Sequence, residues 1–460
     1  MERKTIRKFG IKDEVGYVLG DMGGSFVNLF VDAYFLTFCT YVLGISAAWM
    51  GTLFLIARLW DAINDPIIGS FPDRWRIGKS GNKFIPYIKI FTVPLALSGV
   101  LCFANVPFTG IALHAWVAFV YVMYGMCYTG ASMPYGAMAS VISSDPTHRA
   151  KLSRDRSLGG TIVGMCALSF VPILCFDADN NILPERFFLL SIVFGICSVA
   201  CYIGTVRLCK ERVQQPHAKV KFNYLHVVKQ ALMNRPLVGC MIATIGSCLY
   251  ITGNSQLRSY IYKEFYQDAG AMTLVSLASI PVMLICFPLI PRLVKALGKR
   301  TLILWSSVYS LVVYGFLLIV PIQNVYVYSI ISIFGTLGQT AFTMTVWALV
   351  TDCLDYGEWK FRERNDGSTY SIFTFARKIG NTAASALASF ALAAVGYVSG
   401  VNIVQTAAAV SGIRVLVCAI PVICSVLEII GIGMIFNLDK KTTETMYSEL
   451  AERRENEENK

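Results

Sequence analysis

The chain has 460 residues, of which 55% are hydrophobic and only 15% are charged, and its formal net charge is +11. Soluble domains carry about 25% charged residues, so this composition excludes an ordinary soluble protein and indicates a surface that lies largely in lipid. Lys and Arg gather in alternate loops, as the positive-inside rule describes, which excludes nucleic acid as the reason for the basic excess. We therefore predict a multi-pass protein of the cytoplasmic (inner) membrane, surrounded by the lipid bilayer, with both termini cytoplasmic.

Apolar segments long enough to cross a bilayer, about 20 residues each, recur along the chain. Twelve such segments predict an all-α membrane protein with twelve transmembrane helices. They cover residues 14–42, 46–71, 87–105, 109–141, 157–177, 186–208, 236–262, 270–294, 300–319, 323–351, 370–397 and 411–437.

The polar stretch from Cys209 to Arg235 is the longest between two apolar segments and divides the chain into halves. Its portion Phe222 to Met233 fits either an amphipathic helix on the inner membrane surface or a plain tether. Two six-helix halves around a midplane cavity are typical of major-facilitator transporters. We predict an N-terminal six-helix bundle (1–208), a cytoplasmic middle loop (209–235), a C-terminal six-helix bundle (236–437) and a cytoplasmic tail, helical or disordered (438–460).

Two acids stand inside the second apolar segment, in the sequence GTLFLIARLWDAINDPIIG. Asp61 and Asp65 share a helix face because they are four residues apart, and Arg58 lies on that face too. Carboxylates at bilayer depth are costly and usually take part in moving ions or substrates. Two acids and one base leave one excess negative charge, so we predict that Asp61 and Asp65 bind a cation. The site is a metal site if the ion is Na⁺ and a proton site otherwise.

The fourth apolar segment offers further oxygen atoms from Tyr128, Thr129 and Ser132. We expect Pro134 to interrupt this helix and free a carbonyl group. Hard cations prefer oxygen ligands, so Thr129 is the candidate that completes the site of Asp61 and Asp65. The alternative interpretation of the segment is a seam of small residues between packed helices.

Asp21 lies in the first apolar segment among small residues, GYVLGDMGGSF, that let another helix approach closely. Two interpretations stay open. Asp21 either accepts hydrogen bonds from sugar hydroxyls or borders the ion site, or it is a buried charge paired with a basic residue.

The eleventh apolar segment carries two adjacent cations, Arg377 and Lys378, too deep for both to reach the membrane surface. Adjacent side chains on a helix point about 100° apart. We expect one of the two to bind an anionic substrate and the other to pair with an acid; a purely structural ion pair is the alternative. Trp347, in the tenth segment, is the aromatic residue expected to stack on a sugar ring.

Acidic and basic residues follow the tenth segment, and a cluster of basic residues follows the corresponding segment of the first half. Such charges are expected to form ion pairs that close a cytoplasmic gate, although a solvated loop is the alternative because exposed pairs contribute only about 0–1 kcal/mol each. The predicted gate consists of Arg149, Asp352, Asp355, Glu358 and Arg362.

The sequence has no arrangement typical of an enzyme. Gly78-Lys79-Ser80 lacks the first glycine of a phosphate-binding loop, since Asp73 stands in its place. No nucleophile–base set and no cysteine spacing for a metal is present. We therefore predict no enzymatic activity and no cofactor, with energy drawn from an ion gradient or with passive transport.

Three segments resemble one family of membrane carriers: GTLFLIARLWDAINDPIIG, RWRIGKSGNKFIPY and LVTDCLDYGEWKFRERNDGSTYSIFTFARK. They are similar to the glycoside–pentoside–hexuronide:cation symporters, to which the melibiose and glucuronide carriers belong. The resemblance covers essentially the whole chain. It implies the twelve-helix major-facilitator fold and symport of a sugar with Na⁺ or H⁺ by alternating access.

The resemblance also implies roles for residues. Asp61 and Asp65 match the cation-binding pair of the family, with Thr129 as a further ligand. Arg156 and Lys378 match basic positions near the sugar and cation sites, and Asp352 and Asp355 match acids of the gate. Ser25 and Ser132 stand where the melibiose carrier has galactoside-binding carboxylates, so loss of these acids with retention of Arg377 and Lys378 favours an anionic sugar.

The predicted partners are a small sugar and a monovalent cation, and the fold class predicts a monomer. The candidate substrate-binding residues are Asp21, Ser25, Tyr128, Ser132, Arg156, Trp347, Arg377 and Lys378. A passive facilitator, or a cation-coupled carrier of a non-sugar amphiphile on the same fold, is the alternative function.

Overall fold

The computed structural model describes residues 7–69, 71–75, 77, 82–143, 145–177, 180–212, 232–362, 366–400 and 403–458. The described residues are almost entirely helical, apart from an isolated antiparallel bridge between Phe176 and Ile182. The helices divide into two compact units. Unit 1 comprises Met1–Lys219 and Val398–Val404, and unit 2 comprises Val220–Tyr397 and Gln405–Lys460.

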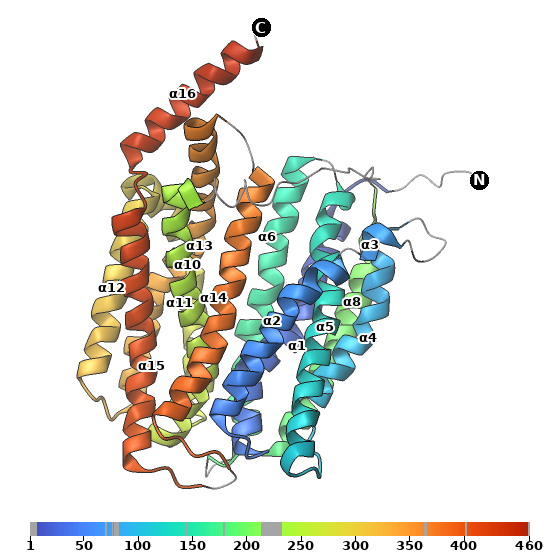
Figure 1. Ribbon diagram of the computed structural model, residues 1–460, viewed down its shortest axis with the longest axis vertical. Helices are drawn as coiled ribbons and strands as arrows, with labels where there is room; N and C mark the ends of the chain where they lie inside the picture. Colours follow the sequence, from blue (N-terminus) through green and yellow to red (C-terminus); the bar gives the residue numbers. More distant parts are fainter. Residues whose placement is uncertain are drawn as a thin grey trace. The chain divides into compact units, whose positions relative to one another are not determined.

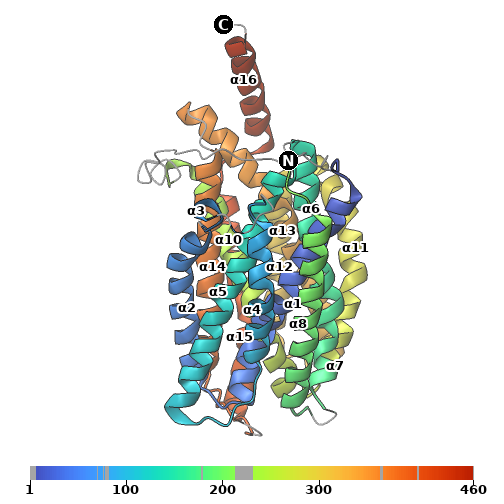
Figure 2. The ribbon, with the colours of Figure 1, turned by 90° about the vertical axis from the view of Figure 1, so that its right-hand side faces the viewer.

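Unit 1 consists of helices that pack mainly through α1 and α5. In it α1 packs against α6 and α8, α4 packs against α5 and α8, and α2 packs against α5; Figure 2 shows α8 beside α1 and α4. The described elements are α1 (Ile11–Tyr41), α2 (Ala47–Gly69), α3 (Phe71–Arg74), α4 (Ile85–Leu101), α5 (Gly110–Ile142), α6 (Pro146–Ile162), the π-helical turn η1 (Val163–Ala167), the 3₁₀ turn η2 (Leu168–Phe170), α7 (Val171–Cys175) and α8 (Pro184–Leu208).

Glycines on α1 explain how closely its neighbours approach. A Cβ atom on Gly20 would overlap the ring of Tyr135 in α5, and one on Gly23 would overlap the ring of Tyr202 in α8. The close approach predicted around Asp21 is therefore confirmed, and it brings α5 and α8 against the helix that carries this acid.

Unit 2 is built around α10, which packs against α13, α14 and α15. Its buried core includes Phe342 and Val346 of α13, Phe373 of α14 and Ile432 of η4. The elements are α10 (Arg235–Tyr260), the π-helical turn η3 (Ile261–Phe265), α11 (Ala271–Leu297), α12 (Lys299–Ile319), α13 (Val325–Phe361), α14 (Asp366–Ala394), α15 (Ala407–Glu428), the π-helical turn η4 (Ile429–Ile435) and α16 (Lys440–Glu458).

Eight helices of the described ranges are long and apolar enough to cross a membrane, and α11 makes a ninth if its two parts, bent by 46°, form one span. These helices confirm the all-α membrane architecture. The other three predicted spans coincide with α2, α4 and α14, which do not qualify. The helix α4 has only 17 residues, and α2 carries Arg58, Asp61 and Asp65 in its apolar sequence. The number twelve therefore stays a prediction.

Three local predictions are wrong. Pro134 does not interrupt its helix, because α5 continues past it to Ile142. The supposed loop at Asp352 and Glu358 is helical, since α13 extends to Phe361. The supposed loop around Arg149 and Arg156 belongs to α6. Charged residues ended the apolar segments that we predicted, whereas the backbone hydrogen bonds of these helices continue beyond the apolar part.

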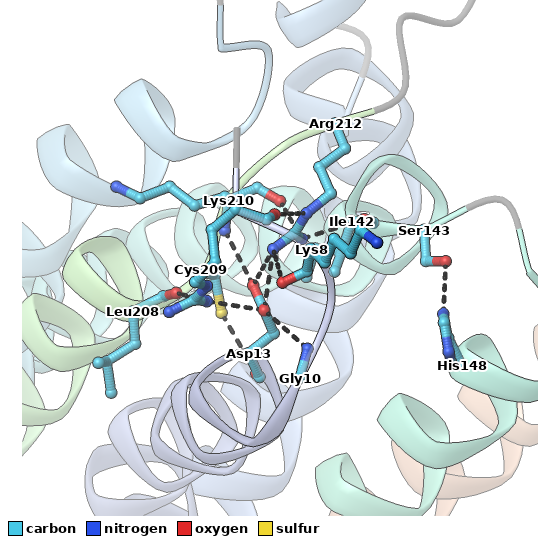
Figure 3. Close-up of polar contacts among 11 residues, drawn as sticks. Lys8, Gly10, Asp13, Ile142, Ser143, His148, Leu208, Cys209, Lys210 and Arg212 are labelled. Atoms are coloured by element: carbon cyan, nitrogen blue, oxygen red, sulfur yellow. Dashed lines mark hydrogen bonds and ion pairs between the residues drawn. The ribbon is translucent and has the colours of Figure 1, made fainter. Parts of the chain in front are cut away.

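The first residues of the predicted middle loop belong to unit 1. Arg212 reaches back to α1, where its Nη2 lies 2.9 Å from the Asp13 carboxylate (Figure 3). Arg7 binds the same carboxylate at 2.7 Å. Glu211 accepts hydrogen bonds from the backbone N–H groups of Phe84 and Ile85, both at 2.8 Å, at the start of α4. Residues 213–231, which include most of the candidate amphipathic helix, lie outside the described residues.

The tail is helical, which was one of the two alternatives predicted for it. Helix α16 follows α15 and η4 in unit 2 (Figure 1, red). Met446 and Leu450 of α16 are buried in the core of unit 2, and Trp359 of α13 donates a hydrogen bond of 2.7 Å to Glu449. The tail is thus packed onto α13.

Candidate functional site

Asp61 of α2 lies beside the guanidinium group of Arg58. Arg58 Nη1 is 3.5 Å from Asp61 Oδ2, and both side chains are largely buried, with exposed fractions of 32% and 22%. A tight charge-assisted hydrogen bond measures about 2.7–2.9 Å, so this contact is longer than such a bond. Arg58 therefore offsets the charge of Asp61 without a close hydrogen bond to it.

Helix α5 meets both acids of α2. The Thr129 hydroxyl donates a hydrogen bond of 2.8 Å to Asp65 Oδ1. One turn earlier, a Cβ atom on Gly125 would lie 3.2 Å from Asp61 Oδ1, so the absence of a side chain there makes room for this carboxylate. The three residues predicted to bind a cation, Asp61, Asp65 and Thr129, thus lie together in unit 1. The binding of a cation by them stays a prediction.

A third acid, Asp32 of α1, belongs to this cluster, and our sequence reasoning missed it. Arg58 Nη2 lies 3.8 Å from Asp32 Oδ1, and the Asn28 amide donates a hydrogen bond of 2.9 Å to Asp32 Oδ2. Tyr124 of α5 donates in turn to Asn28 Oδ1 at 2.8 Å. The sequence did contain the signal, because Asp32 is an acid inside an apolar segment with Asn28 on the same helix face.

The cluster is rich in carboxylates. Asp32, Asp61 and Asp65 belong to it, and acids of this kind are costly at membrane depth. Within the described residues, no three His, Cys, Asp or Glu side chains are grouped so as to hold a metal ion. A Na⁺ ion at Asp61 and Asp65 would therefore need neutral oxygen ligands such as the Thr129 hydroxyl.

A second cluster joins α1 to α6. Arg156 Nε lies 3.7 Å from Asp21 Oδ1, and Ser25 Oγ lies 3.5 Å from Asp21 Oδ2. A Cβ atom on Gly160 would lie 3.0 Å from that same Asp21 oxygen. Asp21 is therefore paired with a basic residue, which was one of its two interpretations. The Arg156 side chain is 52% exposed, so the pair remains open to a polar ligand.

The other two candidates of unit 1 lie on α5. Tyr128 stacks on Tyr124 with 6.2 Å between ring centroids, and its ring edge lies 3.7 Å from the Cβ position of Gly24, the neighbour of Ser25. Tyr128 thus adjoins both clusters. Ser132 lies one turn further along α5 and is half-buried.

The basic candidates of unit 2 lie on α14. The Arg377 guanidinium stands over the Trp347 ring at 5.3 Å from its centroid, and Phe373 packs edge-on against the same ring at 5.4 Å. Both Arg377 and Lys378 are exposed. An aromatic face beside a guanidinium suits a ligand with a sugar ring and an acidic group.

Of the predicted gate residues, Asp352 has partners that we did not expect. It is buried, and Lys299 Nζ lies 2.6 Å from its Oδ1, while Tyr447 of the tail donates to the same oxygen at 2.6 Å. Desolvation and the neighbouring Asp352 carboxylate raise the pKa of the Tyr447 phenol above its usual value, so it stays a donor at neutral pH. Asp352 therefore ties α12 and the tail to α13.

Three of the remaining gate residues lie at the end of α13. Asp355 and Glu358 lie in the last turns of α13, and Arg362 ends the helix with a left-handed backbone, φ 58°. The side chain of Arg149 lies outside the described residues. The gate as a whole stays a prediction.

One further acid escaped the sequence reasoning. Glu428, at the end of α15, is fully buried; it accepts a hydrogen bond of 2.6 Å from the Ser307 hydroxyl and a longer one of 3.4 Å from the Cys424 thiol. A lone acid near the end of the last apolar segment was the available signal.

Comparisons with known proteins agree with this architecture. Residues 16–440 match the family described as MFS/sugar transport protein. The "Uncharacterized symporter YjmB" of Bacillus subtilis (strain 168) is 32% identical, with 95% of this chain and 94% of that protein aligned. The "Glucuronide carrier protein homolog" of Escherichia coli (strain K12) is 27% identical, with 88% of each chain aligned. The inward-open xylose transporter XylE of E. coli has a similar fold, with a TM-score of 0.63 at 13% identity, over 95% of this chain and 98% of that one.

Proposed function

Because the chain belongs to the family of MFS/sugar transport proteins, we propose that it is a secondary active transporter that couples the uptake of an acidic sugar to a monovalent cation. The family and its transporter relatives make the chain an integral membrane protein and not an enzyme. The observation that carries the proposal is the cluster of Asp61, Asp65 and Thr129, because acids at bilayer depth are typical of ion pathways.

The acids of this cluster support the proposal of cation coupling. A cation at Asp61 and Asp65 relieves the repulsion between the acids and ties α2 to α5, on which Thr129 lies. We propose that the cation binds first and that sugar binds to the ordered unit. Only the doubly loaded or empty carrier alternates between the two membrane faces, so the different affinities of these states link the two fluxes.

An acidic sugar is favoured by the basic residues in unit 2. Arg377 and Lys378 lie on α14, and Arg377 stands over Trp347 at 5.3 Å. A guanidinium group binds a carboxylate through two parallel hydrogen bonds, and the indole ring offers a stacking face for the sugar. A relative named as a glucuronide carrier homolog supports the same choice. We therefore propose a hexuronide, such as a glucuronide, as the substrate.

Uptake by purified protein in proteoliposomes tests this function. Labelled methyl glucuronide, methyl glucoside and a pentoside are offered with an inward Na⁺ gradient, an inward proton gradient, or no gradient. We expect methyl glucuronide to accumulate above equilibrium with one of the two ions. Equilibration without accumulation under every gradient would make the protein a passive facilitator. Absence of uptake of all three sugars would favour the non-sugar amphiphile.

A further inference from the structure

Unit 2 contains a cavity that none of the residues discussed above forms. Residues of α10, η3, α11, α12, α13 and α15 line it, and Arg258 of α10 is among them. Arg258 lies in the last turn of α10, within the candidate span Arg235–Phe265. Charged residues within such spans are rare and usually serve a substrate or ion.

The guanidinium group of Arg258 has few protein partners. Its Nη2 donates one long hydrogen bond of 3.4 Å to the Met272 carbonyl, and the group stands over the Tyr262 ring at 5.8 Å. Among the described residues no acid is paired with it. Since a guanidinium group has five N–H donors, most of its hydrogen-bonding capacity is unused.

Two other arginines of unit 2 differ from Arg258 in this respect. Arg300 donates to the carbonyls of Ile432 and Gly433, at 3.1 and 2.8 Å. Arg414 donates to the carbonyls of Leu317 and Leu318, at 3.1 and 3.4 Å, near the end of α12. Carbonyl groups at helix ends attract cations, so these two residues have structural partners.

The cavity around Arg258 has several polar lining groups and is large enough for a ligand group. Hydroxyl and amide side chains line it together with Arg258, among them Asn254, Tyr328 and Thr336. The cavity volume open to the centres of water molecules is about 80 Å³, whereas about 10–15 Å³ suffices for one water. The π-helical turn η3 begins three residues after Arg258, and such turns often occur at functional sites.

We propose that this cavity is a second anion-binding subsite of unit 2, which takes the carboxylate of the acidic sugar at a different stage of transport from Arg377 and Lys378. Arg258 binds the carboxylate there, and Asn254 and Thr336 are placed to bind hydroxyl groups next to it. This inference rests on the proposed function, because it gives the acidic end of the transported sugar a second binding position. That position lies roughly 15 Å along α10 from Cys248, which contacts Arg377.

Isothermal titration of the full-length protein in lipid nanodiscs tests the subsite. The two ligands are methyl glucuronide, which has a carboxylate, and methyl glucoside, which lacks it. Arg258→Gln is expected to raise the Kd of methyl glucuronide about tenfold or more, since a hydrogen bond to a charged group is lost. Its Kd for methyl glucoside should change less than about twofold. Arg258→Lys keeps the charge without the fork of donors and should give a smaller rise for methyl glucuronide.

Arg414→Gln is the matched control, because it removes a guanidinium group from the same unit and should leave the affinity for methyl glucuronide unchanged. If wild-type protein binds methyl glucuronide and Arg258→Gln binds it equally well, the subsite is wrong and the proposed function stands. If wild-type protein binds only methyl glucoside, or neither compound, the acidic substrate and the subsite are both wrong.

Chemical labelling gives a readout on the unmutated chain. Phenylglyoxal modifies accessible guanidinium groups, and peptide mass spectrometry reports each arginine separately. Methyl glucuronide should slow the modification of Arg258 severalfold and leave that of Arg292, an exposed residue of α11, unchanged. Equal labelling of Arg258 with and without methyl glucuronide would overturn the proposal.

Discussion

The two units concentrate opposite charges at membrane depth. Unit 1 places Asp32 and Asp61 beside Arg58 and Asp65 beside Thr129, whereas the functional candidates of unit 2 are cations beside aromatic rings, Arg377 at Trp347 and Arg258 at Tyr262. Glu428, a fully buried acid of unit 2, is held by hydroxyl and thiol groups.

This difference suggests a division of tasks. The acids of unit 1 suit a cation, and the basic side chains of unit 2 suit the acidic group of an anionic sugar. A carrier organised in this way would bind its coupling ion in unit 1 and the acidic group of its substrate in unit 2. Variants that change one property and spare the other test this division.

The largest effect is expected from loss of an acid on α2. Asp61→Asn or Asp65→Asn should abolish gradient-driven accumulation, because loss of one partner from a buried charged contact costs about 3–5 kcal/mol, more than a hundredfold in affinity. Exchange of sugar without a gradient should persist. The measurement is uptake into proteoliposomes, with Asp177→Asn, at an acid between α7 and α8 of the same unit, as the control. Normal accumulation by Asp61→Asn would refute the cation site.

Loss of a basic side chain from α14 should weaken the binding of the sugar and leave the binding of the coupling ion unchanged. Arg377→Gln is expected to lower the uptake of methyl glucuronide about 10- to 100-fold, since hydrogen bonds to charged groups contribute about 1.5–3 kcal/mol. Uptake of a neutral glycoside and the half-saturating cation concentration should stay unchanged. Arg292→Gln, at an exposed position of the same unit, serves as the control. An equal loss for both sugars would mean that Arg377 has a structural role.

The charge of Asp32 should change the affinity of the ion site without a direct contact to the ion. Asp32→Asn removes a negative charge next to Arg58, which then lies beside Asp61 without this second acid. A unit charge at roughly 8 Å contributes about 2 kcal/mol at an effective dielectric constant of about 20, so the half-saturating cation concentration should rise roughly thirtyfold. Uptake at saturating cation should be retained. Glu185→Gln, at an exposed acid in the first turn of α8, is the control, and an unchanged cation dependence of Asp32→Asn would exclude Asp32 from the site.

The smallest effect is expected at Gly125. A methyl group there would lie 3.2 Å from Asp61 Oδ1, so the carboxylate must shift slightly, at a cost of about 0.5–1.5 kcal/mol. Gly125→Ala should raise the half-saturating cation concentration about threefold. Gly315→Ala in unit 2 has no heavy atom within 4 Å of the new methyl group and should be neutral. If the two variants behave alike, Asp61 has more freedom than the packing of α5 indicates.

The sequence predicted the helices well and the contacts between them less well. Apolar runs placed α1, α8 and α12 within a few residues, because lipid requires long apolar helices. It also placed Asp61 near Asp65, since both lie on one helix face. It did not reveal that α1 adds Asp32 to this pair, because that contact depends on how α1 packs against α2. The partners of Asp352 escaped for the same reason, since Lys299 and Tyr447 come from other helices.

The contact between Asp13 and Arg212 has a consequence for the synthesis of the chain. Asp13 is fully buried in the finished protein, and Arg212, one of its two basic partners, follows it by 199 residues. A chain that has emerged only as far as α8 has all the helices of unit 1 and lacks this partner, as well as Glu211 at the start of α4. The contacts by which Arg212 and Glu211 hold α1 and the start of α4 can therefore form only after translation has passed these two residues.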